Sequence, residues 1–169
     1  MDFALDEAQQ AVADLADQIL ADRLDMELLL GIEERGAWFD ADLWASLATA
    51  GLLGITLGED VGGSGLDAVA LAILLRAQGN HVAPLPLLPH GVASLAIERF
   101  GSGEQRRHLL PGCADGSIVL TVAVQEFLDD RLSLPSTTFE NGLLYGTKVV
   151  VEHLDAEPGQ ALGRCQTLS

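Results

Sequence analysis

The sequence predicts a mainly α-helical fold with a C-terminal β portion, that is, an N-terminal helical bundle followed by an incomplete β-barrel or sheet domain. Up to Gly116, apolar residues recur at the helical period, and glycines or prolines separate the periodic segments. After Gly116 the chain turns to short β-branched runs, which favour strands. We therefore expect two domains, residues 1–116 and residues 117–169, the second with an irregular C-terminal end.

The first helix is expected to begin directly after Asp6. Asp6 and Gln9 have the spacing of a capping box, in which each side chain accepts a hydrogen bond from the other residue's backbone amide. Apolar positions then recur on one face at Val12, Leu15 and Ile19. We expect this helix to continue to about Leu30.

Asp40 is the expected N-cap of a second helix. The positions expected to face inward are Leu43, Leu47 and Ala48. Gly51 follows, and a glycine there can adopt the left-handed conformation that ends many helices.

The stretch LGEDVGGSG, residues 57–65, is either a phosphate cradle or a bend between two helices. A Walker loop needs Lys followed by Ser or Thr after its last glycine, whereas Gly65 is followed by Leu and Asp. The GxGxxG spacing of a dinucleotide-binding loop is absent as well, and the two carboxylates of the stretch would repel a phosphate. We therefore interpret the stretch as a bend.

This bend is expected to lead directly into a third helix, from Leu66 to about Gln78. Ser64 followed by Asp67 is an N-terminal capping pattern, so we expect Ser64 to cap this helix. Gly79 is expected to end it. Because the segment is apolar almost all round, it should be buried on more than one side.

Two further helices are expected between the prolines at 84–89 and Gly116. One of these prolines can occupy the first turn of the fourth helix, which is closed by Gly101. The apolar positions of that helix are Val92, Leu95, Ala96 and Phe100. Ser102 and Gln105 form a second capping box, which opens a short fifth helix.

The C-terminal third is expected to contain strands. Residues 117–124, SIVLTVAV, are rich in β-branched side chains and predict a strand. Asn141-Gly142 lies between two further strand-like runs and predicts a hairpin turn. From Glu157 onward the sequence shows no clear periodicity.

Composition excludes several classes of partner. Nine Lys and Arg residues against 25 Asp and Glu residues give a net charge of −16, which would repel nucleic acid and anionic membrane surfaces. The longest apolar run, residues 68–75, is far shorter than the roughly 20 residues that span a bilayer. The N-terminal segment carries acids where a signal peptide carries bases. We expect a cytoplasmic protein without membrane insertion and without a nucleic-acid partner.

The cysteines and histidines give no indication of a metal site. Cys113 and Cys165 lie 52 residues apart by sequence number and form no CxxC pair. The four histidines show neither HxxxH nor HExxH spacing. We therefore assign no metal ligand.

Residues 43–67 resemble the N-terminal helical domain of the acyl-CoA dehydrogenases. In that family a Gly-Leu-hydrophobic-Gly turn is followed by Pro-Glu-x-x-Gly-Gly-x-Gly. The residues that match are Gly51, Leu52, Gly54, Glu59, Gly62, Gly63 and Gly65. Gly58 stands where the family has proline.

Residues 76–126 are similar to the family's next two helices, its Gly-Ser/Thr-x-Glu-Gln-x-x-x-x-Leu-Pro helix and its first strand. The matching residues here are Gly101, Glu104, Gln105, Leu110, Pro111 and Gly116. The likeness therefore extends over nearly the whole chain.

The resemblance implies α,β-dehydrogenation of an acyl or sterol-derived CoA thioester, as in fatty acid β-oxidation and related lipid metabolism. The hydride would pass to FAD and the α proton to a glutamate base. In the family this glutamate belongs to a C-terminal helical bundle beyond the point where this sequence stops. We therefore assign no catalytic residue to this chain and expect the chain alone to be inactive.

The resemblance places the flavin contacts after the first strand. The family reads Thr-Glu-Pro-x-x-Gly-Ser-Asp there, and this chain reads QEFLDDRL, so only the glutamate is retained. Gln125 and Glu126 are the expected flavin contacts, and Arg131 can meet a phosphate. The same side chains could instead end a strand in solvent.

A second flavin contact of the family follows a Gly-x-Lys motif, which matches Gly146-Thr147-Lys148. The family's aromatic-Ile-Thr sequence is replaced here by Val-Val-Glu, residues 150–152, so the aromatic stack and the hydroxyl are lost. Lys148 could equally be an ordinary surface residue of the hairpin.

Three functions remain open at this point. The first is an FAD-dependent acyl-CoA dehydrogenase that acts as a homo-oligomer or as a hetero-oligomer with another acyl-CoA dehydrogenase subunit. The second is a non-catalytic structural subunit, or a truncated paralogue, that assembles with a full-length relative. The third is an acidic helical scaffold with no link to lipid metabolism.

Overall fold

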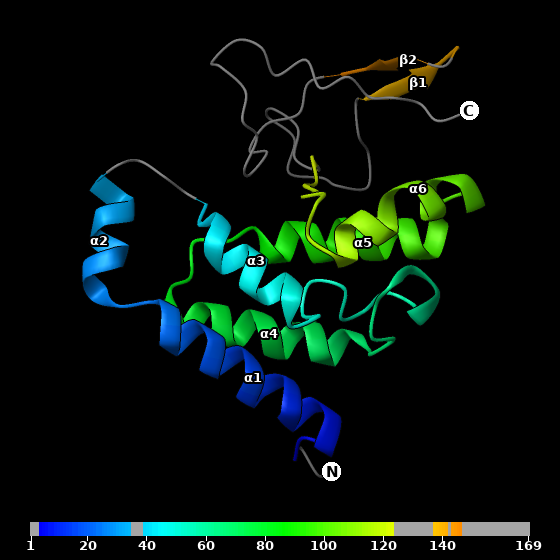
Figure 1. Cartoon of the computed structure of the whole chain (residues 1–169). Helices are drawn as coiled ribbons and strands as arrows, with labels where there is room; N and C mark the ends of the chain where they lie inside the picture. The colour runs from blue at the N-terminus through cyan, green and yellow to red at the C-terminus, as the bar shows by residue number, and fades with distance from the viewer. Residues whose placement is uncertain (1–3, 35–38, 124–136, 142, 147–169) are drawn as a thin grey trace. The chain divides into compact units, whose positions relative to one another are not determined.

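The computed structural model describes residues 4–34, 39–123, 137–141 and 143–146 of the 169-residue chain. The chain divides into two compact units, Met1–Leu120 and Thr121–Ser169, each of which is described by itself. In the first unit, the described residues form six α-helices and one 3-10 turn (Figure 1). The helices are α1 Glu7–Arg23, α2 Met26–Glu34, α3 Ala41–Thr49, α4 Ala68–His81, α5 Leu87–Phe100 and α6 Gly103–Ala114, with the turn η1 at Glu59–Val61.

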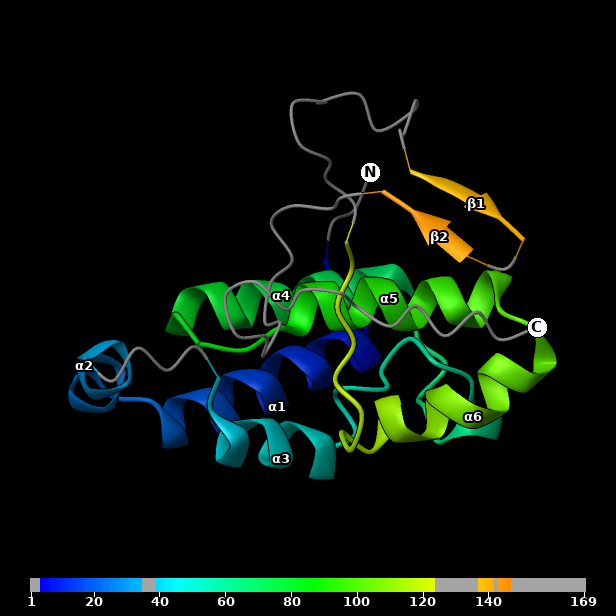
Figure 2. The ribbon, with the colours of Figure 1, turned by 90° about the horizontal axis from the view of Figure 1, so that it is seen from above.

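The helices of the first unit pack around two apolar clusters. Helix α1 lies along α4 and contacts α3, whereas α5 contacts both α4 and α6 (Figures 1 and 2). The larger cluster is formed mainly by α1, α3 and α4 with the segments that flank them. The smaller cluster joins η1 to α6, and its buried members are Leu57, Val61, Leu110, Cys113 and Ala114. The prediction of a mainly helical chain is confirmed.

Helix α1 begins as predicted, and its predicted inward face is confirmed at Val12 and Ile19 but not at Leu15. The Gln9 amide donates to Asp6 Oδ1 at 2.8 Å, and the Asp6 amide donates to the Gln9 side chain at 3.2 Å, which completes the capping box. The expected inward position Leu15 is 39% exposed. The buried side chains are Val12, Ala13, Ala16 and Leu20. Two of these are alanines, whose small side chains let the axes of α1 and α4 approach closely.

The prediction of one helix continuing to Leu30 is wrong. Leu24 has extended backbone angles (φ −110°, ψ 123°), which end α1. Asp25 Oδ1 then accepts a hydrogen bond from the Leu28 amide at 2.8 Å, so Asp25 starts α2 as a separate helix. An aspartate that satisfies a backbone amide in this way favours a helix start over a helix interior.

Helix α3 follows the prediction at both ends. The Leu43 amide donates to Asp40 Oδ1 at 2.9 Å, which makes Asp40 the N-cap. Gly51 has φ +73°, the left-handed conformation expected of a helix-ending glycine. Leu43 and Leu47 are buried as expected, with 1% and 0% exposure.

Helix α4 is displaced relative to its prediction, and both predicted end residues are wrong. Asp67, not Ser64, is the N-cap, because Asp67 Oδ1 accepts from the amides of Val69 and Ala70 at 3.0 and 3.1 Å. The helix also continues through Gly79 to His81. A glycine inside a helix is tolerated at a modest cost, so Gly79 alone does not stop it.

The C-terminal end of α4 is set by Gln78 and by the proline that follows. Val82 adopts φ +52°, a left-handed conformation that is unusual for a β-branched residue. The Gln78 side chain donates to the carbonyls of Ala83 at 3.1 Å and Leu85 at 2.6 Å, which fixes the chain after the helix. Pro84 lies two residues past the C-cap, where it prevents the helix from continuing.

Helices α5 and α6 confirm most of their predicted signals. Pro89 occupies the first turn of α5, and Gly101 is the C-cap. Ser102 and Gln105 form the predicted capping box of α6. The helix then passes through Pro111 and ends at Ala114.

The predicted strand at residues 117–124 is not formed over residues 117–123, which the structure describes. Two backbone amides of this segment donate hydrogen bonds to groups of the helical unit instead. The Ile118 amide donates to the Gly112 carbonyl at 2.9 Å, and the Leu120 amide donates to His90 Nδ1 at 3.2 Å. The side chains of Ile118 and Leu120 pack against the smaller cluster. Contacts with the helical unit therefore replace a strand ladder here.

In the second unit, a two-stranded antiparallel pair confirms the predicted hairpin. Strand β1, Thr138–Glu140, pairs with β2, Leu143–Tyr145, in the register Thr138 to Tyr145. Asn141 in the connecting turn has φ +52°, as a two-residue hairpin loop requires. The larger β domain expected over residues 117–169 stays a prediction.

Candidate functional site

The residues predicted to contact the flavin lie outside the described part of the chain. Gln125, Glu126 and Arg131 belong to residues 124–136, and Lys148 belongs to residues 147–169, none of which is described. The structure does describe the chain up to Ala123, two positions before Gln125. The described residues nearest to these positions are those at which the chain leaves the helical unit, residues 116–120.

Trp44 on α3 fixes the first part of this exit. Its indole Nε1 donates to the Gly116 carbonyl at 2.9 Å, across 72 positions of sequence. Gly116 has φ +79°, and a Cβ there would lie 2.9 Å from the Ala48 Cβ and 3.1 Å from Trp44 Nε1. A side chain at position 116 is therefore excluded both by conformation and by space.

His90 on α5 fixes the second part of this exit, around Leu120. Its ring is 1% exposed, with Nε2 3.2 Å from the Cys113 carbonyl and Nδ1 3.2 Å from the Leu120 amide. The carbonyl accepts and the amide donates, so the ring carries its hydrogen on Nε2 and accepts on Nδ1. This assignment satisfies both nitrogens of a neutral imidazole.

The surroundings of His90 favour its neutral form. Burial lowers the pKa of His90, and the hydrogen bond to the Cys113 carbonyl opposes part of that shift. The ring meets the edge of Trp44 with centroids 5.0 Å apart and planes at 85°. Burial also raises the pKa of the Cys113 thiol, which keeps this neighbour uncharged.

With both ring nitrogens engaged, His90 is suited to hold backbone and not to act as a general base or metal ligand. Histidine spacing, which bears only on metal binding, does not predict this role. The one local signal is that His90 lies in the apolar run PLLPHGVASL. A polar residue on a buried helix face indicates a specific hydrogen-bond partner, but its identity depends on contacts distant in sequence.

The glycine-rich stretch is a bend, as predicted, and its amides are occupied. The amides from Gly62 to Leu66 donate in turn to the carbonyls of Glu59, Gly58, Gly54, Leu57 and Ile55 at 2.8–3.1 Å. A phosphate cradle needs free amides that point at the ligand. The stretch therefore offers no such cradle.

Close packing explains the glycines of this bend. A Cβ on Gly63 would clash with the Leu57 carbonyl oxygen and would lie 2.6 Å from the Gly54 carbonyl oxygen. A Cβ on Gly54 would lie 2.8 Å from the Cβ of Ala114 on α6. These contacts lock the bend against α6, next to the point where the chain leaves the helical unit.

Arg106 on α6 ties the same region to α5. Its NH1 donates to the Glu98 carbonyl at 2.6 Å, and its NH2 donates to Glu98 Oε1 at 3.0 Å. The second carboxylate near it, Asp60 of η1, is 3.7 Å away and 71% exposed, so it contributes less. The arrangement is structural and brings no reactive group into a cleft.

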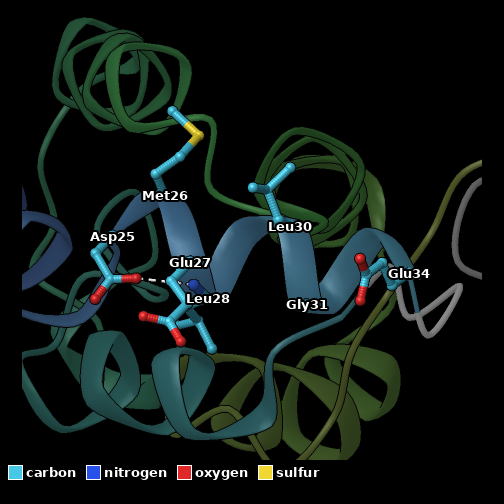
Figure 3. Close-up of a pocket in the computed structure, with 7 residues that line it drawn as sticks. All are labelled: Asp25, Met26, Glu27, Leu28, Leu30, Gly31 and Glu34. Carbon is cyan, nitrogen blue, oxygen red and sulfur yellow. Dashed lines mark hydrogen bonds between the residues drawn. The ribbon is translucent and has the colours of Figure 1, made fainter.

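A hollow lies along α2, which both views place at one end of the helical unit (Figures 1 and 2). Its lining comes from one short segment, Asp25, Met26, Glu27, Leu28, Leu30, Gly31 and Glu34. Figure 3 shows Met26 and Leu30 projecting to the same side of the helix. Ligand sites enclose most of their ligand with converging groups from several elements, which this open hollow does not provide.

Two further kinds of site are not found in the described part of the chain. No group of three or more potential ligands among its His, Cys, Asp and Glu side chains is placed to hold a metal ion. Within the same residues, the helices lack the length and apolar character needed to cross a bilayer.

Comparison with known proteins assigns the helical unit to a family. Residues 6–117 match the model of the acyl-CoA dehydrogenase N-terminal domain. The chain is 30% identical over 152 residues to acyl-CoA dehydrogenase FadE27 of Mycobacterium tuberculosis, covering 89% of this chain and 41% of that protein. It therefore spans about two fifths of the length of this relative.

Similar solved structures support the same family assignment. The Tcur3481-Tcur3483 steroid ACAD G363A variant matches 86% of this chain and 41% of its own chain, with 45% identity and a TM-score of 0.81. The ChsE4-ChsE5 complex from Mycobacterium tuberculosis matches 78% of this chain and 36% of its own chain, with 31% identity and a TM-score of 0.72. The chain belongs to the acyl-CoA dehydrogenase family, of which it contains the N-terminal helical domain.

Proposed function

We propose that this chain is the N-terminal part of an FAD-dependent acyl-CoA dehydrogenase system that carries out α,β-dehydrogenation of an acyl or sterol-derived CoA thioester. The observation that carries the proposal is the 45% identity to a steroid acyl-CoA dehydrogenase at a TM-score of 0.81. That identity favours a sterol-derived acyl group over a simple fatty acyl group.

The proposal assigns two parts to the chain, a helical domain over residues 1–116 and the start of a β domain over residues 117–169. In support of this division, the family match ends at residue 117 and the compact helical unit ends at Leu120. The proposal retains the cytoplasmic location expected from the sequence.

When bound, FAD supplies the hydride acceptor of the reaction. Among the described residues, the glycine-rich bend does not fit a flavin pyrophosphate, because its amides are bonded within the bend. The proposed contacts therefore fall to Gln125, Glu126 and Arg131, with an amide donor toward the flavin and a guanidinium toward phosphate. The contribution of the described residues is to fix the exit of the chain through Trp44 and His90.

We further propose that the chain works in a hetero-oligomer with a second acyl-CoA dehydrogenase polypeptide. Two of the similar solved structures are named as pairs, Tcur3481-Tcur3483 and ChsE4-ChsE5. The chain spans only about two fifths of the length of these relatives.

Co-expression with a full-length acyl-CoA dehydrogenase from the same genome tests the proposal. The 169-residue chain carries an affinity tag, and the purified complex is measured for FAD released on denaturation and for dye reduction by acyl-CoA and sterol-CoA thioesters. We expect a stable complex that contains FAD and turns over thioester.

The matched variants are Gln125→Ala and Arg131→Ala, with Arg107→Ala, an exposed arginine of α6, as the control. Loss of a charge-assisted hydrogen bond at Arg131 should weaken FAD binding about ten- to a hundredfold. FAD content that is unchanged in both variants, with an active complex, would identify the chain as a structural subunit without flavin contacts. A tagged chain that purifies alone and colourless would contradict the proposal.

A further inference from the structure

The buried polar side chains among the described residues are His90 and Ser94, and both serve the exit of the chain. Ser94 Oγ donates to the His90 carbonyl at 2.7 Å, which fixes the backbone that carries the ring. The ring then joins α6, through the Cys113 carbonyl, to the Leu120 amide. Leu120 is the last residue of the helical unit.

We infer that His90 is a protonation-sensitive anchor: its neutral ring holds residues 119–120 on the helical unit, and a proton on Nδ1 releases them. The neutral ring accepts at Nδ1, where the Leu120 amide donates. A protonated ring carries hydrogens on both nitrogens, so Nδ1 would face the amide as donor against donor. The bond to Leu120 is then lost, whereas the bond from Nε2 to the Cys113 carbonyl is kept.

The release is confined to residues 119–120, because two other hydrogen bonds hold residues 117 and 118. The Ser117 amide donates to Asp115 Oδ1 at 2.9 Å, and the Ile118 amide donates to the Gly112 carbonyl at 2.9 Å. Neither bond involves His90. Protonation should therefore free the Leu120 amide while Ile118 stays protected.

Other groups near the ring keep their charge over the same pH range. From α3, Trp44 packs against the ring and does not titrate. From α6, the Cys113 thiol stays neutral because burial raises its pKa. After α6, Asp115 stays ionised because hydrogen bonds from Ser117 lower the pKa of its exposed carboxyl. Of these groups around the ring, only His90 itself changes charge as the pH falls.

Amide exchange in the ¹⁵N-labelled full chain tests the inference directly. Protection of Leu120 and Ile118 is measured at about pH 8 and at the lower pH at which the ring ¹⁵N shifts of His90 show that it has taken up its proton, and corrected for the intrinsic exchange rate. One hydrogen bond is worth roughly a two- to tenfold change in protection. We expect that loss at Leu120 in acid and no change at Ile118.

Two variants that do not titrate separate the ring nitrogens. His90→Asn places an acceptor near the Nδ1 position, and His90→Gln places a donor near the Nε2 position. The asparagine variant should protect Leu120 equally at both pH values, and the glutamine variant should protect it at neither. Equal protection of Leu120 in both variants would overturn the inference.

A wild-type measurement decides the matter where both variants fail to fold. Ring ¹⁵N shifts of His90 report which nitrogen carries the hydrogen. A hydrogen on Nδ1 at about pH 8, or Leu120 protection that does not fall as the ring takes up its proton, would overturn the inference. None of these results depends on FAD, so failure of the proposed function would leave them unchanged.

Discussion

The indole Nε1 of Trp44 donates a hydrogen bond to the carbonyl of Gly116 at 2.9 Å, although the two residues are 72 positions apart in the sequence. The contact joins α3 to the chain just after α6. Trp44 also packs edge-on against His90, whose ring accepts from the Leu120 amide. Trp44 therefore contributes to both contacts that hold residues 116–120 on the helical unit. The packing of Trp44 between α3 and α5 is therefore coupled to the position of the chain just after α6.

Replacing Trp44 by Phe tests this coupling. Phenylalanine keeps an aromatic ring but leaves the Gly116 carbonyl without its donor, so unfolding should become easier by about 1–3 kcal/mol. Urea denaturation followed by circular dichroism measures the change. Phe100→Leu is the control, because Phe100 is 85% exposed and should shift stability by no more than about 0.5 kcal/mol. Equal effects of the two substitutions would contradict the assignment.

Two glycines should respond to alanine in opposite directions. At Gly63 the added methyl meets backbone carbonyl oxygens of Leu57 and Gly54, which cannot move independently, so we expect a loss of about 2–4 kcal/mol. At Gly79, inside α4, a Cβ meets nothing within 4 Å. Gly79→Ala should therefore raise stability by about 0.5–1 kcal/mol. Thermal unfolding of the two variants measures both effects, and destabilisation by Gly79→Ala would contradict the observed helix end at His81.

Replacing Arg106 by Leu should show how much the partly buried Glu98 carboxylate depends on its arginine partner for stability. Glu98 is 18% exposed in its side chain, and its Oε2 is buried with no hydrogen-bond partner among the described residues. Removing Arg106 leaves this carboxylate without its cation, at a cost of about 1–3 kcal/mol. The double variant Glu98→Gln/Arg106→Leu should recover part of the loss, and Arg107→Leu on the exposed face should cost little. A double-mutant cycle without coupling between Glu98 and Arg106 would refute the pairing.

Stability should fall in weak acid because of His90. Its pKa is lowered in the folded chain, whereas the unfolded chain keeps the ordinary value of 6.5. As the pH falls below 6.5, the unfolded chain takes up this proton first, so the His90 contribution is complete above 6.5 and is lost as the pH falls through the folded pKa. Urea midpoints between about pH 8 and about pH 5 should decline less steeply for His90→Asn than for the wild type. Parallel slopes would show that folding does not lower the pKa of His90.

The sequence predicted the features that depend on neighbouring residues. The capping boxes of α1 and α6 and the Asp40 cap each involve side chains within three positions of the amides they bind. The hairpin at Asn141 likewise follows from local conformational preference. Such signals are strong because little else in the fold competes with them.

The sequence predicted less well the features for which two local signals compete or for which a tertiary contact overrides a local signal. Ser64 and Asp67 are both good N-caps, and only the packed structure selects Asp67. Residues 117–123 have strand composition, but hydrogen bonds to α5 and α6 use the amides of Ile118 and Leu120. The anchors formed by Trp44 and His90 depend on contacts 72 and 30 positions apart, which no local pattern encodes. Except for the N-cap of α4, these misses lie where the chain leaves the helical unit, because tertiary contacts there override local propensity.

Acyl-CoA-dependent dye reduction tests the central claim most directly, measured for the 169-residue chain with added FAD, alone and after assembly with a full-length acyl-CoA dehydrogenase. We predict no turnover by the chain alone and turnover by the assembly that is sensitive to Arg131→Ala. Turnover by the isolated chain would contradict the prediction that this chain is inactive by itself.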